Sequence, residues 1–195
     1  MTIELFFTML CYMLVCSLTP GPGNILSLNT MTQYGWKKGR KVIAGICIGY
    51  LCVQYICTLA MYGLNAILSP ALQILKYVGG GYMLWLAYHI AVDKPKVDST
   101  KKEPSFKYGL FLQLVNVKIY FYIISLLLVY YVPYIKSIPG LLLAGLGTVG
   151  IGSIASMIWA FLGLKIQNIY IRYYRFINIV LGLFLVYCSW NIVRG

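Results

Sequence analysis

A six-residue segment that we expect to interrupt a helix lies inside the first long apolar run, which extends from Ile3 to Thr32. The segment reads Thr19-Pro20-Gly21-Pro22-Gly23-Asn24. Two prolines remove two backbone donors, and two glycines remove the steric bias toward helix. Unpaired backbone groups are costly in hydrocarbon, so a break at this depth requires surrounding protein or a water-filled cavity. The segment predicts a broken membrane helix at a binding site; the alternative is a proline kink that only shapes packing.

The composition places this segment in a membrane protein. The chain is 61% hydrophobic and only 10% charged, with a mean hydropathy of +0.80, whereas about a quarter of the residues in a soluble domain are charged. Its formal net charge of +12 could suggest a nucleic-acid partner. The basic residues lie in short gaps between apolar runs, with no soluble region to carry a binding face, so we expect no nucleic acid and a lipid bilayer as the surroundings.

Six apolar runs, each near the ~20 residues that cross a bilayer, predict an all-α polytopic membrane protein with six transmembrane helices. They cover residues 3–32, 42–65, 70–92, 106–132, 138–164 and 176–193. Between the first two lies a short basic turn at 33–41. The only long polar stretch, 93–105, divides a single transmembrane domain at 1–195 into one repeat at 1–92 and another at 106–195.

Lysine and arginine are distributed unevenly among the gaps. Twelve of the sixteen lie around three alternate gaps, at 33–41, 93–107 and 165–175. With six crossings, these gaps lie on one side of the membrane. Short loops rich in lysine and arginine stay in the cytoplasm, so we expect both termini to be extracytoplasmic.

The two halves have corresponding features. Spans two and five are both rich in glycine, which lets helices approach closely in lipid. Because each half has an odd number of spans, the halves run in opposite directions, as in the inverted repeats of many transporters. In this arrangement the counterpart of the break at Thr19-Pro20-Gly21 is Asn116-Val117-Lys118 in span four.

Lys118 is the only basic residue deep in a span. It lies eleven residues after Lys107, or about 16 Å into the membrane at the helical rise. A buried ammonium is expected to face a cavity or a partner; the alternative is snorkelling to the interface. We expect Asn116 to share this cavity, with Gln113 as a weaker candidate. No Asp or Glu lies deep in any span, so a carboxylate proton relay is not predicted.

The six cysteines all lie in apolar runs, without C-x-x-C pairs or a cysteine-rich loop. Neither a metal site nor a disulfide framework is indicated, and we expect no cofactor. A membrane thiol–disulfide relay is the alternative function, but it needs close cysteines from both halves. Span one contains Cys11 and Cys16, whereas span four contains none.

At these residues the chain resembles the LysE/RhtB amino-acid exporters. The features that carry the resemblance are Thr-Pro-Gly-Pro in span one, the glycines leading into span two, Leu75-x-x-x-Gly79…Tyr82 in span three and Asn-x-Lys in span four. They cover essentially the whole chain. Most similar is the pattern of the members that export cysteine and O-acetylserine, in Gln113-x-Val115-Asn116-Val117-Lys118-Ile119 and in the run from Asn178 to Cys188. The family usually has proline where Val117 stands, which leaves open whether span four is unwound there.

The resemblance implies a secondary transporter in the bacterial plasma (inner) membrane, not an enzyme. It would export small neutral amino acids of the cysteine/O-acetylserine type, by antiport with protons. Export of homoserine, threonine or lysine, a non-transporting assembly role, and assembly into a homo-oligomer remain open. We expect the substrate carboxylate to meet Lys118 or the N–H groups after Pro22, where the helix dipole is positive. The substrate ammonium would meet free carbonyls at the break and the amide oxygens of Asn24 and Asn116.

Overall fold

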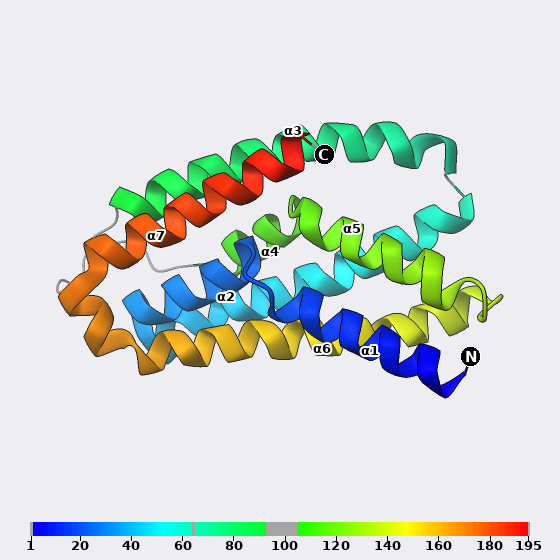
Figure 1. Cartoon of the computed structure of the whole chain (residues 1–195), viewed down its shortest axis with the longest axis horizontal. Helices are drawn as coiled ribbons and strands as arrows, with labels where there is room; N and C mark the ends of the chain where they lie inside the picture. Colours follow the sequence, from blue (N-terminus) through cyan, green and yellow to red (C-terminus); the bar gives the residue numbers. More distant parts are fainter. Residues whose placement is uncertain (1, 64, 93–104, 195) are drawn as a thin grey trace.

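A computed structural model describes residues 2–63, 65–92 and 105–194, and these residues are helical apart from short breaks and turns (Figure 1). This confirms the all-α class. The predicted polar loop at 93–105 lies outside the described residues except for Ser105. The helices are α1 (Ile3–Leu18), α2 (Pro22–Gly63), α3 (Asn65–Val92), α4 (Phe106–Leu114), α5 (Val117–Leu126), the π-helix η1 (Leu127–Tyr131), α6 (Ile138–Lys165) and α7 (Gln167–Arg194).

The first apolar run is broken between α1 and α2. The helix α1 ends at Leu18, and Pro22 is the first residue of α2. Proline suits that position because the N–H it lacks would have no helical partner there. The break is narrower than the 19–24 segment predicted, since Gly23 and Asn24 already belong to the first turn of α2.

Gly35 divides α2 into two arms, which we call the first arm (22–34) and the second arm (36–63). Its φ of 67° and ψ of 179° are not helical, and glycine adopts this positive φ without steric cost. Figure 1 shows the chain turning back between the arms. Within the predicted basic turn at 33–41, only Gly35 is therefore non-helical, and the residues on both sides of it are helical.

Span four is also broken, although it lacks the family's proline. The helices α4 and α5 meet at Val115 and Asn116 with a bend of 58°. Asn116 takes a non-helical φ of −81° and ψ of 90° as the residue before α5. Asparagine is common at this position, although the Asn116 side chain does not cap α5 here. The break lies one residue before Val117, close to the position expected from the first half.

Two other helix bounds differ from the prediction. The helix α3 begins at Asn65, five residues before the expected start at Pro70. The helix α7 begins at Gln167, with a non-helical residue at Tyr173, where a gap at 165–175 was expected. Polar and aromatic residues end an apolar run without ending a helix, so hydropathy places spans better than it places helix ends.

Two of the described helices are long and apolar enough to cross a membrane by themselves, Pro22–Met61 and Ile138–Lys165. The bent pair α4 and α5–η1 forms a third if it is counted as one span. The helix α1 has only 16 residues. Large apolar side chains are exposed on every long helix, for example Phe7, Leu143 and Leu183, as expected for surfaces that face lipid.

The helix α2 packs most extensively against α6 and α4, and α3 pairs with α7 (Figure 1). The crossing of α2 and α4 depends on two glycines. A Cβ on Gly45 would overlap the Phe106 carbonyl oxygen, and one on Gly109 would overlap the Val42 carbonyl oxygen. Each glycine thus meets the other helix's backbone, which confirms for this pair the close packing predicted from glycine content.

We expect Gly45→Ala to destabilise the protein by about 1–3 kcal/mol or more, because the added methyl group meets a backbone that cannot move aside easily. Gly150→Ala is the matched control, since a Cβ there has nothing within 4 Å. Thermal unfolding of the two variants in the same detergent measures the difference. Equal melting temperatures would contradict the close α2–α4 contact.

Candidate functional site

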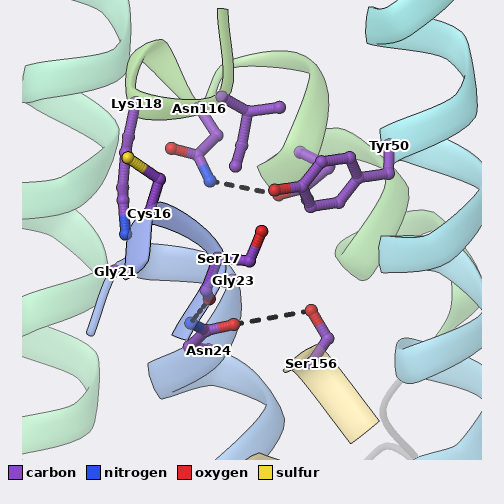
Figure 2. A pocket seen from close by; sticks show the side chains of 11 residues that line it. Cys16, Ser17, Gly21, Gly23, Asn24, Tyr50, Asn116, Lys118 and Ser156 are labelled. Carbon is purple, nitrogen blue, oxygen red and sulfur yellow. Dashed lines mark hydrogen bonds between the residues drawn. The ribbon is translucent and has the colours of Figure 1, made fainter. Parts of the chain in front are cut away.

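A pocket lies where the two helix breaks meet (Figure 2). Four helix ends surround it: the carboxyl ends of α1 and α4, and the amino ends of α2 and α5. The residues that line it come from these ends and from two packed helices. They are Cys16, Ser17, Gly21, Gly23, Asn24, Tyr50, Gln113, Asn116, Lys118, Ile119 and Ser156.

Side chains from other elements bind the last carbonyls of α1. The Lys118 ammonium donates a hydrogen bond of 2.8 Å to the Thr19 carbonyl oxygen. Asn24 Nδ2 donates to the carbonyl oxygens of Ser17, at 2.8 Å, and of Thr19, at 3.1 Å. Trp159 Nε1 donates to that of Leu18 at 3.1 Å. The break thus presents a carbonyl-rich surface that attracts positively charged donors.

Gly21 gives Lys118 the space to reach this surface. A Cβ on Gly21 would lie 3.0 Å from Lys118 Cδ and 3.1 Å from Lys118 Nζ. A side chain at position 21 would require the Lys118 side chain to shift by a few tenths of an ångström. The glycine of the break and the lysine of span four therefore fit together as one unit.

Asn116 and Gln113 form the α4–α5 side of the pocket. Asn116 Nδ2 donates to Gln113 Oε1 at 3.1 Å, and both side chains are almost fully buried. Asn116 Oδ1 is buried without a hydrogen-bond partner. A buried acceptor without a partner costs free energy, so this oxygen is available to a donor that enters the pocket.

The pocket residues that the sequence did not reveal are Ser17, Tyr50, Ser156, Cys16 and Ile119. Ser156 Oγ donates to Asn24 Oδ1 at 3.5 Å, and Ser17 Oγ donates to the Tyr122 hydroxyl at 3.4 Å. In Figure 2 the Tyr50 ring points toward the pocket. Single serines and tyrosines are common in apolar helices, and only the packing of α2 and α6 around the breaks brings these ones together.

The electrostatics of the pocket suit a zwitterion. The amino ends of α2 and α5 carry the positive ends of two helix dipoles, and the carboxyl ends of α1 and α4 carry negative ends. Lys118 is the only charged side chain among the residues that line the pocket. A small molecule with one carboxylate and one ammonium finds a partner of opposite sign for each.

Six of the predicted residues line the pocket together: Gly21, Gly23, Asn24, Gln113, Asn116 and Lys118. Thr19 takes part through its carbonyl group, while its side chain is turned back to the carbonyl of Val15. Pro20 and Pro22 are not among the lining residues and act by interrupting the helix. The pocket has room for about one water molecule, so a substrate requires the surrounding helices to separate.

Comparisons with known proteins identify the family of the chain. Residues 14–195 match the family described as LysE type translocator. The chain belongs to this family. It is 36% identical over 194 residues to a cysteine/O-acetylserine efflux protein of Klebsiella pneumoniae, covering 99% of both chains. It is 34% identical over 190 residues to the protein of the same name from Escherichia coli K12, covering 97% of both. No solved structure gives a significant match.

The family match includes both helix breaks of this LysE type translocator, since 14–195 contains residues 19–21 and 115–116. It confirms the resemblance found in the sequence. The described residues of this translocator contain no group of three or more His, Cys, Asp or Glu side chains that could hold a metal ion.

Proposed function

We propose that this translocator exports small neutral amino acids, with cysteine and O-acetylserine as the first substrates, from the cytoplasm across the bacterial inner membrane. The observation that carries the proposal is the pocket at which two broken helices present positive and negative ends to the same small space. Membership of the LysE type translocator family and the names of the two efflux relatives support the same substrate class. Transport requires no bond-making step, so no enzymatic activity is proposed.

In the proposed binding mode the substrate replaces a contact that the protein makes with itself. Without substrate, the Lys118 ammonium binds the Thr19 carbonyl oxygen. The substrate ammonium takes this carbonyl and the Asn116 Oδ1 acceptor, and Lys118 turns to the substrate carboxylate. The N–H groups of the first turn of α2, after Pro22, add to carboxylate binding because they lack helical partners. After this exchange, the Lys118 ammonium and both charged groups of the substrate each have a partner.

Proton antiport is the proposed source of energy. Since no carboxylate lines the pocket, Lys118 is the group proposed to exchange a proton during the transport cycle. The pocket is built within one chain, so the proposed site needs no second copy.

We further propose that residues 1–92 and 106–195 are inverted repeats of one transmembrane domain, joined by a cytoplasmic loop at 93–105, with both termini extracytoplasmic. The two breaks occupy corresponding positions in the first span of each half, which supports this arrangement. Labelling of a cysteine placed at position 101 by an impermeant reagent in intact cells would rule out the orientation.

Transport by purified protein in liposomes tests the function. A panel of labelled amino acids, including cysteine, O-acetylserine, homoserine, threonine and lysine, is measured with and without a pH gradient. We expect saturable transport of small neutral amino acids, accelerated by the gradient, and little transport of lysine. Equal transport with and without the gradient would remove the proton from the proposal, and transport of none of the panel would remove the export function.

A further inference from the structure

Two buried polar pairs lie on α2 outside the pocket, one on each arm. On the first arm, Gln33 Nε2 donates to Asn29 Oδ1 at 3.1 Å. On the second arm, Gln54 Nε2 donates to Thr58 Oγ1 at 3.2 Å. Gln33 is 8% exposed and Gln54 is fully buried. In both glutamines the amide oxygen Oε1 is buried without a hydrogen-bond partner.

The two pairs lie on opposite sides of the pocket in the direction that crosses the membrane. On the first arm, Asn24 lines the pocket, and Gln33 is nine residues closer to the turn at Gly35, or about 13 Å at the helical rise. On the second arm, Tyr50 lines the pocket, and Gln54 is four residues further from that turn, or about 6 Å. Under the proposed orientation, Gln33 is on the cytoplasmic side and Gln54 on the extracytoplasmic side.

Buried polar side chains extend along α2 from the pocket to Gln54 and Thr58. Tyr50, Gln54 and Thr58 follow one another at helical spacing and so share one face of α2. Gly145 of α6 leaves room for the Gln54 amide, since a Cβ there would lie 2.7 Å from Gln54 Nε2. One turn further along α6, the Thr148 hydroxyl is 2.9 Å from the Tyr131 hydroxyl. Tyr131 belongs to η1, and π-helical turns often occur at functional sites.

A buried amide group can have a purely structural role. In that role both its N–H donor and its oxygen acceptor are expected to be paired. Here the donor end of each glutamine is paired and the acceptor end is not. In an apolar environment such an acceptor carries a free-energy cost that packing alone does not require. The arrangement suits a donor that is present for only part of a cycle.

We propose that Gln33 and Gln54 are transient binding sites for the substrate ammonium, on the cytoplasmic and extracytoplasmic sides of the pocket respectively. The inference rests on the proposed export of amino acids. An amide oxygen can only accept hydrogen bonds, so these two oxygens bind the ammonium group of the substrate. Asn116 Oδ1 is the acceptor between them. The three oxygens form a sequence of acceptors from one side of the membrane to the other.

The test is whether each substitution affects only one face of the protein. Gln54→Met and Gln33→Met keep side-chain length and remove the amide. Counterflow of labelled O-acetylserine is measured in right-side-out and inside-out vesicles. Loss of one hydrogen bond is expected to raise the apparent KM about fivefold, for Gln54→Met at the extracytoplasmic face and for Gln33→Met at the cytoplasmic face. The opposite face of each variant should change by less than a factor of two.

Asn168→Leu, which removes an exposed amide at the start of α7, is the control and should alter neither face. If Gln54→Met does not fold, Thr58→Val replaces it. It removes only the hydroxyl bound to the Gln54 amide, and the same one-sided change is expected in smaller size. If the apparent KM changes equally at both faces, or at neither, the inference is overturned. Transport by the wild-type protein would still support the export function. Absence of wild-type transport would remove both.

Discussion

Lys118→Met should fold normally and lose about 10- to 100-fold in substrate affinity, the usual contribution of a charge-assisted hydrogen bond. The substitution keeps side-chain length and removes the only charge among the residues that line the pocket. It also leaves the Thr19 carbonyl without its ammonium donor. Binding to the purified variant in detergent, measured by calorimetry, gives the affinity, and liposome transport gives the rate.

Lys118→Arg separates the binding role from the proton role. The guanidinium stays protonated under all accessible conditions, so this variant should bind substrate but transport it slowly or without pH dependence. If Lys118→Met transports at the wild-type rate with an unchanged pH profile, neither role is correct. If Lys118→Arg behaves as wild type, Lys118 binds substrate and does not carry the proton.

Replacing Pro20, Gly21 and Pro22 by alanine should preserve membrane insertion and abolish export. Alanine is more favourable in a helix than glycine by about 1 kcal/mol and than proline by about 3 kcal/mol. With three alanines, α1 and α2 would therefore join into a continuous helix. The carbonyl and amide groups that face the pocket would then bond to each other. The new side chain at position 21 would also meet Lys118.

Membrane insertion and liposome transport are measured side by side for this triple variant. Pro133→Ala, at an exposed position after η1, is the control for loss of a proline and should transport normally. Normal export by the triple variant would reduce the break to a kink without a role in binding.

The sequence was most informative where residue chemistry limits the backbone. A six-residue segment with two prolines and two glycines, inside an apolar run, predicted a break in the helix. The structure has this break at 19–21. The glycines of span two indicated close packing, and Gly45 meets the α4 backbone. Lys118 was identified because an ammonium deep in a span needs a partner, although the partner itself, the Thr19 carbonyl, is 99 residues away.

The parts that the sequence did not reveal depend on contacts between distant helices. Nothing local distinguishes Ser156 from other small residues of α6; its place opposite Asn24 follows from the packing of α6 against α2. The break at Asn116 has no proline, and its position was inferred from the corresponding break in the first half. Gln54 is one of several polar residues in apolar runs. Only the structure shows that its amide oxygen is buried without a hydrogen-bond partner.

The reactivity of Cys16 reports directly on whether the amino acid binds where the two breaks meet. Cys16 lines the pocket, whereas Cys11, on the same helix, is exposed. Two variants are needed, each retaining one of these cysteines and having alanine at the other five cysteine positions. The rate of alkylation by a maleimide is followed with and without saturating O-acetylserine. We predict that substrate slows alkylation of Cys16 severalfold, leaves Cys11 unchanged, and protects neither cysteine when Lys118 is also replaced by methionine. Equal rates at Cys16 with and without a substrate that the protein transports would place the binding site elsewhere.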